Sequence, residues 1–210
     1  MSEAATSTPA GSPARAEQRP ARRTAILEAT VRILGSSGLG AVTHRAVAQE
    51  AGVPLAATTY YFRSKDELIT EAVSLLVSEE IAQLAKRAAA LGEGLGSPER
   101  GATALVQVLM PDESATRAQL AKFELYLEAA RRPNLRPSAA QWQQAFIGLA
   151  EMVLHAAGAP DPSRRAPLVV TAVDGVLMYE LSATGTEPVR ERLRRRFTGI
   201  LELVLSDPGK

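Results

Sequence analysis

Residues 43–68 read THRAVAQEAGVPLAATTYYFRSKDEL and contain two short helical segments that meet at a glycine. The first segment begins at Thr43, whose hydroxyl can cap a helix, and ends at Gly52, which can adopt a left-handed backbone conformation after the last turn. The second segment spans residues 54–62. This arrangement is typical of a helix-turn-helix, in which the second helix can enter the major groove of DNA.

Small and apolar residues are placed where these two segments must pack. Val47 and Val53 supply the apolar contact between them, and the short side chain of Ala48 permits a close approach. Any compact helical hairpin could show the same pattern. The flanking sequence is therefore needed to decide between the two interpretations.

The flanking sequence predicts one helix before this stretch and a long helix after it. Residues 22–37 carry apolar side chains at spacings of three and four, and Gly38 and Gly40 follow as stop signals. Ser64 and Glu67 match a capping box, which opens a helix that extends to about residue 90.

The remainder of the chain is also predicted to be helical. The stretch LGEGLGSP at residues 91–98 is the clearest break in composition. Helices are expected beyond it, and Ser138 with Gln141 suggests a second capping box. The expected ranges are 98–110, 114–131, 138–157, 163–184 and 188–205. No segment alternates like a strand, so the sequence predicts an all-α fold of about nine helices.

Composition excludes several classes of protein. The chain has 210 residues, 46% hydrophobic and 22% charged, which is enough apolar material for a packed core. It has no cysteine and two histidines, and it lacks a glycine-rich phosphate loop and a Ser/His/Asp signature. We therefore expect no enzyme, no cofactor and no metal site. No apolar stretch is long enough for a membrane span and no signal peptide is visible, so we expect a cytoplasmic protein.

Positive charge is concentrated near the N-terminus. Residues 1–65 contain eight basic and four acidic side chains, a net charge of +4, whereas the whole chain carries +1. Residues 1–21 have almost no large apolar side chain and are predicted to be a disordered basic arm. Its arginines, and Arg22 and Arg23 after it, could reach DNA phosphates or a minor groove, or the arm could be a solubilising tail. Residues 206–210 are predicted to be a disordered tail.

The run from Gly52 through Tyr60-Tyr61-Phe62 to Ser64-Lys65, with a helix before it, resembles the TetR family of bacterial transcriptional regulators (TetR/AcrR-like). The resemblance covers residues 22–72. It implies a three-helix helix-turn-helix DNA-binding domain over residues 22–66, joined by the long fourth helix to an effector-binding and dimerisation domain over residues 67–205.

The resemblance assigns DNA contacts residue by residue. Thr43 matches a phosphate-contacting threonine, or it is only a helix cap. Arg45 matches a position that reaches a base edge in some members, or it is only an exposed arginine. One of the two adjacent tyrosines is expected in the core and the other on a phosphate. Lys65 lies at a helix N-terminus, where a cation is unfavourable unless an anion such as phosphate lies opposite. The candidate residues are Thr43, Arg45, Pro54, Leu55, Ala56, Ala57, Thr59, Tyr60, Tyr61 and Lys65.

The second helix departs from the family pattern in two ways. Thr59 stands where many members have an aromatic residue, and no basic residue occurs between Gly52 and Phe62. Base reading would therefore depend on methyl groups and threonine hydroxyls, mainly those of Leu55, Ala56, Ala57 and Thr59.

For the C-terminal part, the family implies a pocket for a small, largely apolar effector. Sparse aromatic residues, methionines and one acidic residue are candidates, although the same spacings are also typical of plain core. They are Met110, Phe123, Tyr126, Trp142, Phe146, Asp174 and Met178. Asp174 lies in an apolar helix, so it must be paired, hydrated at an interface or bound to a ligand. The Asp-Gly pair that it forms with Gly175 is frequent in the family and favours a place near the dimer interface.

The resulting hypothesis is a repressor that binds a palindromic operator as a homodimer and is released by a small molecule. The alternative is a helical ligand-binding or protein-interaction module of the same fold without operator recognition. The arginine-rich segment 190–196 could be a second nucleic-acid surface. We expect instead a solvated helix face that pairs with acids across the dimer.

Overall fold

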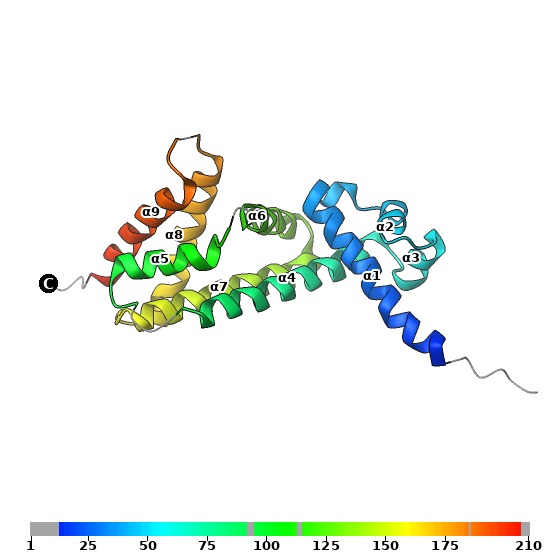
Figure 1. Cartoon of the computed structure of the whole chain (residues 1–210), viewed down its shortest axis with the longest axis horizontal. Coiled ribbons are helices and arrows are strands. Elements are labelled where there is room, and N and C mark those ends of the chain that lie inside the picture. The colour runs from blue at the N-terminus through cyan, green and yellow to red at the C-terminus, as the bar shows by residue number, and fades with distance from the viewer. Residues whose placement is uncertain (1–12, 92–94, 113–114, 185, 207–210) are drawn as a thin grey trace, which may run out of the picture. The chain divides into compact units, whose positions relative to one another are not determined.

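The computed structural model describes residues 13–91, 95–112, 115–184 and 186–206, and within these ranges all regular structure is helical. The all-α class is therefore confirmed for the described part of the chain, which contains nine α-helices and two short 3-10 segments (Figure 1). The elements are α1 (Pro13–Ser37), η1 (Leu39–Ala41), α2 (His44–Glu50), α3 (Leu55–Tyr61), α4 (Lys65–Ala89), α5 (Pro98–Leu109), α6 (Ala115–Arg131), η2 (Pro133–Leu135), α7 (Arg136–Ala156), α8 (Pro162–Ser182) and α9 (Val189–Leu205).

The chain divides into two compact units, residues 1–75 and 76–210. The division lies inside α4 rather than at the glycine-rich stretch or at the expected position between residues 66 and 67. The first turns of α4 belong to the first unit because their apolar side chains Leu68, Ile69 and Ala72 are fully buried there. An ion pair between Arg23 and Glu71 also joins α1 to this part of α4.

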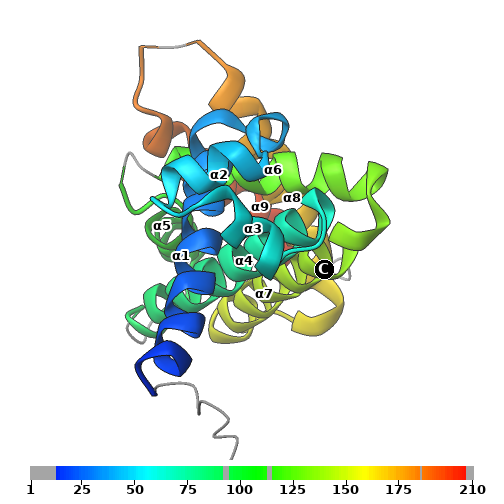
Figure 2. The ribbon, with the colours of Figure 1, turned by 90° about the vertical axis from the view of Figure 1, so that its right-hand side faces the viewer.

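In the first unit, α1, α2 and α3 pack as the sequence predicts (Figure 2). Val47 and Ala48 are buried between the helices. Gly52 has φ of +64°, a left-handed conformation that L side chains rarely adopt, and it reverses the chain after α2. The amide of Val53 then donates to the carbonyl of Ala48 at 3.0 Å, which fixes the turn before α3 begins.

Helix α1 begins nine residues earlier than expected. Residues 13–21, predicted to be part of a disordered arm, are helical. The proline at position 13 suits the first turn of a helix, and alanines at positions 14, 16 and 21 have high helix propensity. Residues 1–12 of the expected arm, and 207–210 of the expected tail, lie outside the described residues.

In the second unit, α5 packs on α9, and α8 packs on both α7 and α9. The contact of α5 with α9 is close: a Cβ at Gly101 would lie 2.8 Å from Cδ1 of Leu201. The prediction of a capping box at Ser138 is wrong, because α7 begins at Arg136 and Ser138 is buried in its first turn. A proline at the second position of α7 favours this earlier start.

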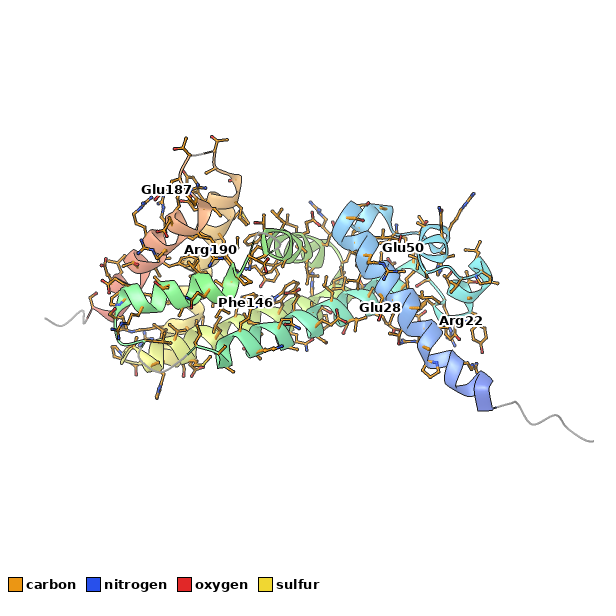
Figure 3. All side chains as sticks on the ribbon, viewed as in Figure 1. Arg22, Glu28, Glu50, Phe146, Glu187 and Arg190 are labelled. Carbon is orange, nitrogen blue, oxygen red and sulfur yellow. The ribbon has the colours of Figure 1, made fainter. Side chains whose placement is uncertain are left out.

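The arginines of segment 190–196 have hydrogen-bond partners within the chain. Glu180 of α8 is buried and accepts from Arg192 at 2.5 Å and from Arg196 at 3.1 Å. Glu187, which is labelled in Figure 3, accepts two hydrogen bonds from Arg195, at 2.9 and 2.8 Å. The Arg192 hydrogen bond holds the pKa of Glu180 below its usual value of 4.5. The segment therefore ties α9 to α8.

No helix in the described part of the chain is both long and apolar enough to cross a membrane.

Candidate DNA-binding surface and ligand pocket

Helix α2 carries the first two candidate residues on exposed positions. Thr43 is the N-cap of α2, and its hydroxyl oxygen accepts from the amide of Ala46 at 3.1 Å. This geometry establishes the capping role and leaves the hydroxyl hydrogen free to donate to another acceptor. Arg45 is exposed and, among the described residues, has no acidic partner.

The outer face of α3 is small and apolar. Leu55 is 51% exposed and Tyr60 64% exposed, and Ala56 and Thr59 are exposed between them. The hydroxyl of Thr59 donates to the carbonyl of Ala56 at 3.2 Å, which leaves its oxygen as an acceptor. Pro54 is the exposed N-cap residue and Ala57 is half-buried. Such a surface offers methyl contacts and hydrogen-bond acceptors, and it offers no cation.

The two adjacent tyrosines have different environments. Tyr61 is half-buried, whereas Tyr60 is largely exposed, and their rings meet edge to face with centroids 5.1 Å apart. The guanidinium of Arg19, on the N-terminal extension of α1, donates to the Tyr60 hydroxyl and lies 5.6 Å from the centroid of its ring. Phe62 is fully buried in the core. The extension of α1 therefore holds the side chain of Tyr60.

Five cations in the first unit have no acidic partner among the side chains that the structure describes: Arg19, which donates to the Tyr60 hydroxyl, and Arg22, Arg45, Arg63 and Lys65. In contrast, Arg23 pairs with Glu71, and Arg32 pairs with Glu50 at 2.7 Å. The unpaired set comes from three helices and one loop. No described carboxylate forms an ion pair with these side chains, so their charge can attract an anion.

The start of α4 is organised by a reciprocal cap. The Ser64 hydroxyl accepts from the amide of Glu67 at 3.1 Å, and the Glu67 carboxylate accepts from the amide of Arg63 at 2.6 Å. This confirms the interaction of Ser64 with Glu67, although the carboxylate binds the amide one residue before the expected one. Lys65 is the first residue of α4 and is half-buried. The cap fixes the backbone that carries Arg63 and Lys65.

In the second unit, three helices meet around one buried ammonium group. Lys122 of α6 is 1% exposed, and its Nζ lies 2.6 Å from Oδ1 of Asp174 on α8. The same Nζ lies 4.5 Å from the ring centroid of Phe146 on α7 and 4.8 Å from that of Phe123 on α6. Asp174 is therefore paired within the chain, and its side chain is 21% exposed.

Two polar atoms on the same helix as Lys122 lack hydrogen-bond partners in the described part of the chain. They are the hydroxyl oxygen of Tyr126 and Oε1 of Gln119, both buried. Burial, together with the nearby carboxylate of Asp174, raises the pKa of Tyr126 far above its usual value. Burial lowers the pKa of Lys122, and the attraction of Asp174 opposes that change. Buried groups without partners are costly, so this polar cluster is unusual for a core.

An apolar cavity of about 20 Å³ adjoins the cluster and shares Asp174 and Phe146 as wall residues. Its other lining residues are aliphatic: Leu105, Leu109, Leu149, Ala150, Val169, Val170 and Val173. About 20 Å³ is room for one water molecule. Trp142 stacks on Phe146 with centroids 6.5 Å apart.

The structure thus gathers five of the seven candidate pocket residues, Phe123, Tyr126, Trp142, Phe146 and Asp174. The two methionines lie elsewhere. Met110 is fully buried at the end of α5 and does not line the cavity. Met178 is 54% exposed on the same face of α8 as Leu168 and Tyr179, because it is out of phase with the buried Val170, Val173 and Leu177.

Sequence reasoning missed three of these residues. Arg63 was counted only as a charge, although it follows the second helix of the motif directly. Lys122 and Gln119 lie on the buried face of α6 with Tyr126, at helical spacings. The helical spacing of Lys122 relative to the apolar residues of α6 could have indicated a buried lysine.

Two sequence families match the chain. The family described as "Bacterial regulatory proteins, tetR family" matches residues 26–72. The family described as "Tetracyclin repressor-like, C-terminal domain" matches residues 96–203, just over half of the chain.

Similar individual proteins are regulators and a drug-binding protein. The HTH-type transcriptional regulator BetI of Rhizobium meliloti (strain 1021) is 31% identical over 118 residues, which are 56% of this chain and 56% of BetI. The chain thus matches little more than half the length of this relative. A transcriptional regulator from Rhodococcus sp. Rha1, RHA1_ro04179, is 26% identical with a TM-score of 0.69, and the match covers 89% of this chain and 99% of that one.

The multidrug binding protein EbrR, in complex with ethidium, is 34% identical with a TM-score of 0.63. The match covers 86% of this chain and 98% of EbrR. Other structures of EbrR contain imidazole, proflavin or malachite green.

Proposed function

The chain belongs to the TetR family of bacterial regulatory proteins, and on this premise we propose that it is a ligand-responsive, sequence-specific regulator of transcription. The observation that carries the proposal is the helix-turn-helix of the first unit, which exposes one face of α3 and carries five cations without acidic partners among the described side chains. DNA supplies the matching anions at regular spacing.

We assign the polar and cationic residues around α3 to the phosphates. The Thr43 hydroxyl and the Tyr60 hydroxyl can each donate to a phosphate oxygen, and Lys65 can approach one as a point charge. Arg45 is assigned to a base edge, where a guanidinium can bond guanine at two atoms. Base recognition by α3 itself would use methyl groups and the acceptor oxygen of Thr59. The residues that would contact the bases with Thr59 are Pro54, Leu55, Ala56 and Ala57. The ring of Tyr61 would support that of Tyr60.

We further propose that the protein acts as a homodimer through α8 and α9. Apolar side chains are exposed on both helices: Leu168, Met178 and Tyr179 on α8 and Leu203 on α9. Apart from its chain neighbours and the backbone of α8 itself, no atom of the described residues lies within 4 Å of a Cβ placed at Gly175, so a second copy could approach there. A two-fold dimer presents two copies of α3, and its operator would be an approximate palindrome.

The effector, in this proposal, binds between α6, α7 and α8. The apolar cavity and the polar cluster beside it supply the wall, and the ligands of EbrR support small-molecule control by analogy. Binding would release the operator if the effector prefers the conformation that does not fit DNA. The proposed function needs no catalytic residue, metal or cofactor. A bacterial regulator of this kind would act in the cytoplasm, where the DNA lies.

A second candidate function follows from the unusual α3. Because α3 carries no cation and mostly methyl groups, the same fold could act as a ligand-binding or protein-interaction module without operator recognition. This alternative predicts that the protein binds no DNA sequence in preference to another.

The test is selection from a pool of random-sequence duplexes at about 150 mM salt, repeated at higher salt. We expect enrichment of a palindrome whose half-sites are about one helical turn apart. Failure of folded, dimeric protein to enrich any sequence, with and without candidate effectors, would favour the second candidate.

A further inference from the structure

The buried ammonium of Lys122 lies against three electron-rich groups, one carboxylate and two aromatic rings. Asp174 supplies a carboxylate oxygen at 2.6 Å, and the rings of Phe146 and Phe123 face the nitrogen at centroid distances of 4.5 and 4.8 Å. The Tyr126 hydroxyl, one turn further along α6, is close enough to Asp174 to feel its charge. A carboxylate beside aromatic faces is a typical arrangement for holding a cation.

These surroundings would reject an anion. An anionic ligand bound to Lys122 would have to displace the Asp174 carboxylate, and it would then meet two ring faces that carry partial negative charge. A cationic ligand has only to replace the ammonium of Lys122. The groups around the nitrogen therefore select positive charge, whether it belongs to the protein or to a ligand.

The ammonium of Lys122 has a second hydrogen-bond acceptor within reach when it leaves Asp174. The lysine ammonium is at the end of a flexible four-carbon stem, whereas its two aromatic neighbours are rigid. Oε1 of Gln119, three residues earlier on the same helix, is buried and has no hydrogen-bond partner among the described residues. Residues three apart on a helix are neighbours, so this oxygen can accept from the displaced ammonium.

The apolar cavity determines what else the ligand must carry. Asp174 and Phe146 line both the ammonium site and the cavity, so a charged group at Asp174 would be continuous with an apolar group in the cavity. The cavity has about 20 Å³, so the ligand must also take the volume that the ammonium leaves and move the aliphatic lining. Asp174 is 21% exposed, which gives this end of the site access to solvent.

We propose that Asp174, Phe123 and Phe146 form a cation subsite that the ammonium of Lys122 fills when no ligand is bound, and that the effector is an organic cation with an apolar body that displaces it. This inference rests on the proposed effector pocket. It adds the chemical class of the ligand and a built-in competitor. The apparent affinity for the ligand is then the intrinsic affinity multiplied by the fraction of time that the subsite is empty.

The test measures binding to the full chain without DNA, so its outcome is independent of operator recognition. The probes are benzyltrimethylammonium, its neutral carbon isostere neopentylbenzene, and the anion phenylacetate. Trp142 is the only tryptophan and stacks on Phe146, so its fluorescence reports the site directly, and calorimetry gives the affinity independently. The variants are Lys122→Met, Asp174→Asn and Phe146→Leu, with Lys86→Met as the matched loss of an exposed lysine on α4.

We expect wild type to bind benzyltrimethylammonium in preference to both other probes. Lys122→Met should tighten cation binding about ten- to a hundredfold, as expected if the competitor-free state is populated at about 1 to 10%. Asp174→Asn should weaken it at least about tenfold, and Phe146→Leu about fivefold. Lys86→Met should leave it unchanged.

Three outcomes would overturn the proposal. One is tighter binding of phenylacetate than of the cation, lost in Lys122→Met, which would make Lys122 an anion anchor. Another is equal binding of the cation and its neutral isostere. The third is absence of cation binding to folded wild type and Lys122→Met. If Lys122→Met does not fold, the Phe146→Leu and Asp174→Asn measurements on the wild-type lysine still decide between cation, anion and neutral ligands. Selection of an operator alongside any of these outcomes would leave the DNA-binding proposal intact.

Discussion

Replacement of Asp174 by asparagine tests whether the buried pair with Lys122 organises the second unit. The change keeps the size of the side chain and one oxygen acceptor but removes the negative charge 2.6 Å from a nitrogen that is almost fully buried. Removal of one partner from a buried ion pair typically costs about 3 to 5 kcal/mol, because the remaining charge loses its compensation. The retained amide oxygen can recover about 1 kcal/mol of this. We therefore expect a loss of about 2 to 4 kcal/mol in the free energy of unfolding.

The assay is urea denaturation followed by Trp142 fluorescence, because Trp142 is buried in the same unit. The control is a double-mutant cycle with Lys122→Met. If the two charges compensate each other, the double variant should be more stable than the sum of the single losses predicts, by about 2 kcal/mol. A loss below about 0.5 kcal/mol in Asp174→Asn, or additive losses, would refute the reasoning.

Three further perturbations address other parts of the account. Lys65→Ala should weaken binding to all duplexes alike and reduce the slope of log affinity against log salt by about 2 per dimer, since each subunit loses one phosphate contact; an unchanged slope would remove Lys65 from the phosphate contacts. Arg45→Ala should cost about 1 to 3 kcal/mol on the selected duplex but much less on random DNA, and equal losses on both would exclude base reading by Arg45. Glu180→Gln should cost about 3 kcal/mol at neutral pH. The pKa of Glu180 is lowered in the folded protein, so its carboxylate stabilises the fold above pH 4.5 and loses this effect as the pH falls through the folded pKa. The stabilities of wild type and variant should therefore converge in acid. A constant difference in stability across this pH range, measured by urea denaturation, would contradict the ionised pairing of Glu180.

The helical order and most helix ends could be predicted because local signals determine them. The caps at Thr43 and Ser64, and the glycine turn at position 52, involve residues a few positions apart, and each is present in the structure. At Ser138 the local sequence predicts the wrong helix start. Its sequence matches a capping box, but the side chain is buried by tertiary packing and the preceding proline already starts the helix.

The pocket could be predicted only in part because its contacts are distant in sequence. Lys122 and Asp174 are on different helices, and nothing local to either residue identifies its partner. The aromatic residues Phe123 and Phe146 were candidates by type, but the position of a lysine ammonium over both rings depends on how α6, α7 and α8 pack. Met178 has the right residue type but lies on an exposed face of α8.

The ratio of the affinities for two duplexes shows whether the first unit binds DNA in a sequence-specific way. Full-length protein is titrated with its selected duplex and with a scrambled duplex of the same length and composition, both at about 150 mM salt. We expect the affinity for the selected duplex to exceed that for the scrambled duplex at least about 1,000-fold. Equal affinity for the two duplexes would contradict it.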